Sequence, residues 1–225
     1  MPVYGRRSIV IPILILGTLA VGVGGWFAYR VFVRRQVSDE ADRLARVLAL
    51  ESTSRVADVG AGNGAYTLEL ASRIVPKGHV FTTEIEQDAV GALRDKAAAA
   101  GLHNVTALLA AEDSTNLPLN CCDAAFLRGV YHHITRPAET NASLRNAIRP
   151  GGRIAIIDFA PSWFLSTFFP VRGVPANRGG HGVAPAVAIG ELEQAGFTLV
   201  DRVHDWTRGQ YCLVFRKPES VSGRQ

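Results

Sequence analysis

The sequence predicts an α/β fold: a mostly parallel sheet of seven strands with helices on both faces and an antiparallel hairpin at the end. Short apolar runs alternate with helical patterns over residues 55–160, and such alternation builds a parallel sheet covered on both sides. Two more strand patterns follow, joined by residues 207–209. A link this short forces an antiparallel pair, because a parallel crossover needs about a dozen residues or more.

The individual elements follow from their patterns in chain order. Residues 38–51 predict an amphipathic helix, in which Ser38 suits the N-cap and Leu44, Val47 and Leu48 share one face. Strands are predicted at 55–60, 79–85, 105–111, 122–129, 153–160, 197–206 and 210–218. Helices are predicted at 65–75, 87–101, 137–148 and 185–196, the third of them ending at the Pro-Gly turn of residues 149–152.

Length and composition bound the class of protein. The 225 residues suffice for one α/β domain and an appendage, and the 48% hydrophobic content argues against disorder outside the polar tail, residues 219–225. The net charge of +4 is modest, and no basic stripe with interleaved aromatics is present, so nucleic acid is not an expected partner. The adjacent Cys121 and Cys122 are expected to be buried, reduced thiols.

The N-terminal segment predicts a membrane anchor. Residues 8–29 form a run of 22 residues without a charge, and a helix of that length spans roughly 30 Å, the thickness of a bilayer core. A cleaved signal peptide has a shorter apolar region, a twin-arginine signal is only faintly echoed, and a core helix this long would keep a polar face. We therefore expect an uncleaved single-pass anchor.

Arginine counting orients this anchor. More arginines follow the apolar run than precede it, which by the positive-inside rule places the C-terminal domain in the cytoplasm. Ala20, Gly24 and Ala28 recur every four residues and leave open a homodimer through the anchor helix. The predicted organisation is an anchor with basic flanks (1–36), a catalytic domain (37–218) and a disordered tail (219–225).

The first strand ends in the glycine-rich turn of residues 60–64. Gly60, Gly62 and Gly64 let the backbone approach a ligand closely, and the helix that follows favours negative charge at its start. Glu84 lies 24 residues after Gly60, close to where an acid that binds a ribose belongs. On these features alone a nicotinamide dinucleotide enzyme remains open.

Asp58 changes this balance. It is a carboxylate inside the first apolar strand, where a charge is costly unless a positive or hydrogen-bonding group meets it. A pyrophosphate would be repelled there, whereas an α-amino group would be favoured. S-adenosylmethionine carries an amino acid end and no phosphate, so it explains Asp58 better.

Several motifs in order resemble the class I S-adenosylmethionine-dependent methyltransferases, whose fold is Rossmann-like. "VADVGAGNGAYT" resembles their D-x-G-x-G-x-G motif, "AEDSTNLPL" resembles their acid–Leu-Pro segment, and the resemblance covers roughly residues 40–218. It implies that Glu84 accepts the ribose hydroxyls, that Asp113 accepts from the adenine amino group, and that Arg128 lies beside the methionine part. The cofactor-binding residues it implies are Asp58, Gly60, Gly62, Asn63, Gly64, Glu84, Ile85, Asp113 and Arg128.

The same resemblance implies methyl transfer to a nucleophile, with a base where the acceptor must lose a proton. The candidate catalytic residues are Tyr131, His132, His133 and His181. A metal bound by His132, His181 and Asp158 is an alternative, but no ligand spacing demands one, so no metal site is predicted. Histidine is the base expected near neutral pH, and His181 lies on a glycine-rich loop that is expected to close over the acceptor.

The acceptor is predicted only as a class. Residues 160–183 form an apolar insert with four aromatic side chains, Trp163, Phe164, Phe168 and Phe169, which indicate an apolar acceptor or a surface against the membrane. Together with the anchor they favour a small or lipid-like acceptor at the cytoplasmic membrane face. A nicotinamide-dependent oxidoreductase and a non-catalytic S-adenosylmethionine-binding module are the alternatives.

Overall fold

The structure is a computed structural model that describes the backbone of residues 10–207 and 209–219. Side chains are described at residues 25–26, 28–175, 177–207 and 209–219. The chain divides into two compact units, Met1–Glu40 and Ala41–Gln225, and the sheet, the cavity and all the candidate site residues belong to the second.

One long helix, α1 (Val10–Leu48), replaces the separate helix predicted to begin at Ser38. No glycine or proline occurs between Tyr29 and Leu48, so nothing in the sequence stops the helix before Ser38. The predicted membrane segment, residues 8–29, lies largely outside the residues whose side chains the structure describes. Within the described part of the chain, no helix combines the length and the apolar character needed to cross a membrane.

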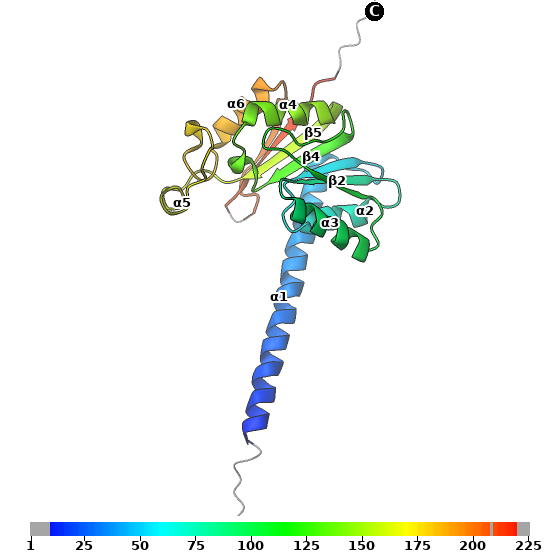
Figure 1. The fold of residues 1–225 in the computed structure, drawn as a ribbon, viewed down its shortest axis with the longest axis vertical. Coiled ribbons are helices and arrows are strands. Elements are labelled where there is room, and N and C mark those ends of the chain that lie inside the picture. Colours follow the sequence, from blue (N-terminus) through cyan, green and yellow to red (C-terminus); the bar gives the residue numbers. More distant parts are fainter. Residues whose placement is uncertain (1–9, 208, 220–225) are drawn as a thin grey trace, which may run out of the picture. The chain divides into compact units, whose positions relative to one another are not determined.

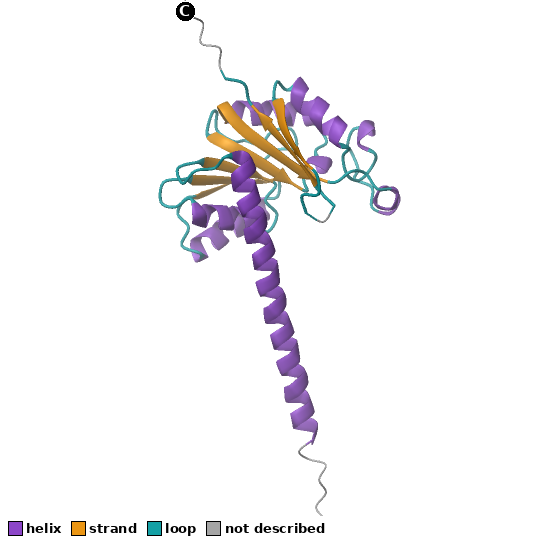
Figure 2. Ribbon diagram, turned by 180° about the vertical axis from the view of Figure 1, so that it is seen from behind, coloured by secondary structure: helices purple, strands orange, loops and turns teal. Residues whose placement is uncertain are grey.

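Seven strands form a single mixed sheet, as the sequence predicts (Figure 2). Its order is β3-β2-β1-β4-β5-β7-β6. Strands β1 to β5 pair in parallel, whereas β7 pairs antiparallel with both β5 and β6. The strands are β1 (Arg55–Val59), β2 (His79–Glu84), β3 (Val105–Leu109), β4 (Cys122–Arg128), β5 (Ile148–Asp158), β6 (Thr198–Val203) and β7 (Tyr211–Arg216).

Helices cover both faces of the sheet, with α4 and α6 on one side and α2 and α3 on the other (Figure 1). Their bounds are α2 (Ala65–Arg73), α3 (Gln87–Ala99), α4 (Pro137–Ala147) and α6 (Pro185–Gln194). Buried side chains alternate between two cores: Ala57 packs with the α4–α6 side and Val56 with the α2 side. Covering both faces explains why the parallel strands are almost continuously apolar.

Two parts of the chain differ from the predicted elements. Strand β5 begins at Ile148 and not after the Pro-Gly turn, because Ile148 pairs with Cys122 and the N–H of Gly151 donates to the carbonyl of Lys217. The apolar insert also contains elements that its pattern does not show. These are α5 (Trp163–Phe168) and the 3₁₀ turn η2 (Ala176–Arg178), and a further 3₁₀ turn, η1 (Tyr131–His133), follows β4.

Candidate active site

A cavity of about 410 Å³ opens where the carboxyl ends of β1, β2 and β4 meet. Ligands of open α/β sheets bind at this edge, and small-molecule sites commonly measure roughly 300–1,000 Å³. The predicted site residues that line the cavity are Gly60, Gly62, Glu84, Ile85 and His133. The predicted residues that are not part of its lining are Asp58, Asn63, Gly64, Asp113, Arg128, Tyr131, His132 and His181.

The glycine turn is shaped by its packing as well as by its backbone. Gly60 and Gly64 have φ values of +72° and +79°, in the left-handed region that favours glycine. A Cβ at Gly60 would lie 2.7 Å from the side chain of Val130, and one at Gly64 would lie 2.5 Å from that of Leu93. A Cβ at Gly62 would meet nothing within 4 Å, so Gly62 borders open space in the cavity.

Glu84 connects the glycine turn to the end of β2. Its carboxylate accepts a hydrogen bond from the backbone N–H of Gly62. The neighbouring Ile85 is 60% exposed and lines the same cavity, where its side chain offers an apolar surface to a flat ring. The carboxylate and the apolar surface suit a ribose and its base.

The charge of the cavity favours a cationic ligand. Among the described residues that line it, Glu84 and Glu112 are acidic and none is lysine or arginine. A pyrophosphate carries negative charge and is usually met by positive groups or free backbone donors. Here the N–H groups of Gly60 and Ala61 both donate to the carbonyl of Thr83.

Asp58 lies in the interior of the sheet. Only 3% of its surface is exposed, and its carboxylate accepts a hydrogen bond of 2.6 Å from the hydroxyl of Thr67 in α2. Burial raises the pKa of Asp58 to about 7, the Thr67 hydrogen bond lowers it and the charge of Glu84 adds to the rise. The hydrogen-bonding partner of Asp58 is therefore the hydroxyl of Thr67, which the sequence pattern did not reveal.

Three other residues predicted to bind the cofactor have protein partners. Asp113 forms an ion pair with Arg136, half exposed at the surface, while its neighbour Glu112 lines the cavity. The guanidinium of Arg128 lies 4.7 Å from the ring centroid of Tyr66. The side-chain oxygen of Asn63 accepts from the N–H of Ala65 at the start of α2.

Three histidines from two separate loops meet in space. The rings of His132 and His181 stack with centroids 5.1 Å apart, and the rings of His132 and His133 have centroids 4.0 Å apart. The loop after β4 and the glycine-rich loop are thus in contact through these rings. Within the described residues, no group of His, Cys, Asp and Glu side chains has the arrangement of a metal site.

Asp158, at the end of β5, fixes the orientation of His132. Its carboxylate lies 2.8 Å from Nδ1 of His132 and also accepts the backbone N–H of His132 at 3.0 Å. Both side chains are buried. Because a carboxylate is an acceptor, Nδ1 of His132 carries the proton, which sets the tautomer of a neutral ring.

His133 is the histidine that borders the cavity. Desolvation lowers the pKa of His133 below its usual 6.5, and the neighbouring His132 and His181 lower it further. A lowered pKa keeps the ring neutral near pH 7, so His133 is able to accept a proton.

Tyr131, one of the predicted catalytic residues, lies in the core and outside the lining of the cavity. It is fully buried, its hydroxyl donates to Glu191 at 2.8 Å and accepts from Asn141, and Arg178 donates to its carbonyl. Burial raises the pKa of Tyr131 well above its usual value, and the charge of Glu191 adds to this. An ion pair of 2.7 Å between the buried Arg178 and the partly exposed Glu191 joins the apolar insert to α6.

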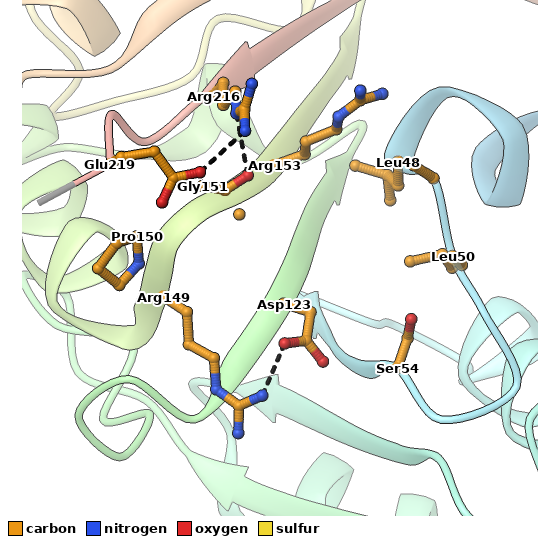
Figure 3. Close-up of a pocket in the computed structure, with 12 residues that line it drawn as sticks. Leu48, Leu50, Ser54, Asp123, Arg149, Pro150, Gly151, Arg153, Arg216 and Glu219 are labelled. Carbon is orange, nitrogen blue, oxygen red and sulfur yellow. Dashed lines mark hydrogen bonds and ion pairs between the residues drawn. The ribbon is translucent and has the colours of Figure 1, made fainter.

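A second pocket, of about 420 Å³, lies at the opposite edge of the sheet (Figure 3). Arg149 pairs with Asp123, Arg216 pairs with Glu219, and Arg153 donates to a backbone carbonyl of α1. Because these three arginines already have partners within the chain, we interpret their contacts as structural. We assign no ligand to this pocket.

A protein-family model for a methyltransferase domain matches residues 50–174. The chain is 28% identical over 109 residues to the ubiquinone/menaquinone biosynthesis C-methyltransferase UbiE of Burkholderia cenocepacia. The match spans 48% of this chain and 44% of that relative, so the chain covers less than half the length of the curated relative.

Solved structures share the fold at low identity. A methyltransferase from Aquifex aeolicus that depends on S-adenosylmethionine superposes with a TM-score of 0.64 and 22% identity, over 79% of this chain and 89% of that one. The cyclase SpnF superposes with a TM-score of 0.67 and 20% identity, over 81% and 82%. These likenesses establish the fold. Because SpnF is a cyclase, the same fold also supports a reaction other than methyl transfer.

Proposed function

Because this chain belongs to the methyltransferase domain family, we propose that it transfers a methyl group from S-adenosylmethionine to an apolar, quinone-like acceptor. The class of enzyme and the methyl donor follow from the family and from the glycine motif of residues 58–64. The observation that carries the proposal is the cavity at the carboxyl edge of the sheet, where the glycine turn, Glu84 and His133 meet.

The residues of the cavity fit S-adenosylmethionine. Glu84 would hold the ribose hydroxyls, Ile85 would cover the adenine, and the backbone at Gly60 and Gly62 would approach the methionine part. An acidic cavity without lysine or arginine among its described lining residues suits a sulfonium ligand that also carries an ammonium group. It does not suit the pyrophosphate of a nicotinamide dinucleotide, so the oxidoreductase alternative is not favoured.

When bound, S-adenosylmethionine supplies an electrophilic methyl group. The chain contributes orientation of the acceptor and a base. His133 borders the cavity as a neutral ring, and it would take the proton that the acceptor loses. The His132 ring packs on His133, and Asp158 holds His132 through its carboxylate, so both would act as positioning residues.

The acceptor is proposed as an apolar, quinone-like molecule. The cavity is lined largely by apolar groups, among them Val59, Val130 and Ile134, and the insert that follows β5 is rich in aromatic side chains. The name of the Burkholderia relative refers to the biosynthesis of ubiquinone and menaquinone. The proposal extends that substrate class to this chain because both observations favour a flat, apolar acceptor.

We also propose that residues 8–29 anchor the chain in a membrane with the domain of residues 37–218 in the cytoplasm. The support is the run of 22 residues without a charge and the excess of arginines after it. A quinone-like acceptor dissolves in the bilayer, so an anchored enzyme would work at the surface that holds its substrate. A homodimer through the small residues of this segment stays a prediction.

Replacing Glu84 by glutamine is expected to weaken S-adenosylmethionine binding by about tenfold to a hundredfold, because a charged acceptor is lost from the ribose contact. Isothermal titration calorimetry on the full chain measures this. Glu86→Gln is the matched control, since Glu86 is exposed two residues further along and makes no side-chain cap bond to α3.

Two results would contradict the proposal. One is equal affinity of the Glu84→Gln and wild-type chains for S-adenosylmethionine. The other is tighter binding of a nicotinamide dinucleotide than of S-adenosylmethionine. A chain that binds S-adenosylmethionine but turns over no acceptor would support the non-catalytic alternative instead.

A further inference from the structure

The short helix α5 presents a group of aromatic side chains to solvent. None of the residues of α5 is buried. The exposed side chains, called the aromatic surface below, are Trp163 (78% exposed), Phe164 (54%), Phe168 (59%) and Phe169 (59%). The rings contact one another, with the centroids of Phe164 and Phe168 5.0 Å apart. Contiguous apolar groups of this kind mark a surface that binds a membrane or a partner.

The charge of the surrounding chain favours a membrane. No acidic residue occurs between Asp158 and Glu191, and the exposed Arg172 lies three residues after Phe169. Aromatic rings beside basic residues are typical of segments that lie in the headgroup region of a bilayer. The positive charge of Arg172 would attract an anionic lipid surface, and no carboxylate within residues 159–190 offsets it. The uncharged run of residues 8–29 in the same chain makes a bilayer the expected occupant.

The aromatic surface is coupled to the histidine cluster. The hydroxyl of Ser166, within α5, donates to the carbonyl of Gly179 at 2.6 Å. A ring nitrogen of His181 bonds to the carbonyl of Phe169. Since His181 stacks on the buried His132, the insert connects the exposed aromatic groups to the three histidines.

We propose that the aromatic surface seats in the headgroup region of a lipid bilayer and that an apolar acceptor enters from the bilayer beside α5. This inference rests on the proposed function, because it assumes an acceptor that dissolves in lipid. Docking at α5 would bring the insert that carries His181 to the membrane surface, so the acceptor would not cross water. The insert thus acts as the membrane-binding element of the catalytic domain.

A fluorescent probe on the full chain tests this contact. The chain is reconstituted in nanodiscs of phosphatidylcholine and phosphatidylglycerol, and Phe168→Cys is labelled with a nitrobenzoxadiazole dye. The native cysteines are free but buried, and unsubstituted chain measures any background labelling. Leu119→Cys is the matched control, because Leu119 is a single apolar side chain with 73% exposure.

We expect nitroxide-bearing lipids to reduce the emission of the dye at Phe168→Cys by roughly half or more, as for a group in the headgroup region. The dye at Leu119→Cys should not respond. Trp163→Cys provides a second labelling position in case Phe168→Cys misfolds. Emission that nitroxide lipids leave unchanged at both positions would overturn the inference, as would equal quenching at the Leu119→Cys control.

Calorimetry on the same labelled chains separates this inference from the proposed function. If S-adenosylmethionine binds while the dye is unquenched, only the membrane contact fails. If the dye is quenched while S-adenosylmethionine does not bind, the membrane contact stands and the proposed function fails.

Discussion

Replacing His133 by asparagine is expected to lower kcat by about two to four orders of magnitude, the usual contribution of a general base. His133 borders the cavity and its pKa lies below 6.5, because burial and the neighbouring His132 and His181 disfavour its charged form. The ring is thus ready to accept a proton at pH 7. Transfer of labelled methyl groups into membrane extract, measured at saturating S-adenosylmethionine, gives the comparison.

The pH dependence of the same reaction gives an independent readout. In the wild-type enzyme kcat should fall as pH decreases through an apparent pKa below 6.5, since protonation removes the base. His133→Asn should lose this acid limb and keep its affinity for S-adenosylmethionine. The control is His103→Asn, an exposed histidine between α3 and β3. A wild-type kcat in the His133→Asn variant would contradict the assignment.

The second large effect concerns the pH dependence of stability and Asp58. Burial raises the pKa of Asp58 from 3.8 to about 7, so the folded chain binds this proton more tightly than the unfolded chain. Stability is therefore lost as pH rises from about 4 to about 7. A shift of about three units corresponds to roughly 4 kcal/mol at most. Asp58→Asn removes the titration while keeping an acceptor for the hydroxyl of Thr67.

Asp58→Asn does not lose this stability as pH rises. The difference in the free energy of unfolding, Asp58→Asn minus wild type, is therefore expected to grow by up to roughly 4 kcal/mol between pH 4 and pH 8. Urea unfolding of both chains without ligand, at several pH values, measures the difference. Asp95→Asn, an exposed carboxylate of α3, should track wild type at every pH. An Asp58→Asn variant whose stability runs parallel to wild type would show that Asp58 is not buried as a protonated acid.

The sheet could be predicted from the sequence because its signals are local. Each parallel strand is a short apolar run, and the short link before β7 fixes the direction of the final pair. The start of β5 could not be predicted, since it depends on Ile148 pairing with Cys122 across the sheet. The predicted helix start at Ser38 was wrong, because α1 runs through Ser38 without interruption. A residue that suits the N-cap does not by itself end a preceding helix.

In the candidate site, residues within one motif were easier to predict than residues brought together by the fold. Gly60, Gly62 and Glu84 lie at strand ends, and the topology alone carries them to one edge. Neighbouring residues with equal chemistry were not distinguishable: Glu112 lines the cavity, whereas Asp113 faces Arg136.

The role of Tyr131 depended on partners distant in the chain. A tyrosine beside two histidines suggests chemistry, but its hydroxyl meets Glu191, 60 residues away. The buried Arg178 that contacts Tyr131 also lies within a glycine-rich loop that had no packing signal. Such contacts between loops follow from the tertiary structure, which a local sequence pattern does not contain.

Transfer of a labelled methyl group from S-adenosylmethionine to membranes tests the central claim most directly. With the full chain in nanodiscs that contain a prenylated naphthoquinol, label should appear in the organic extract with wild type and decrease strongly with Glu84→Gln. Wild-type chain that is folded and binds S-adenosylmethionine, yet leaves no label in the organic extract of either the naphthoquinol nanodiscs or native membranes, would contradict the account.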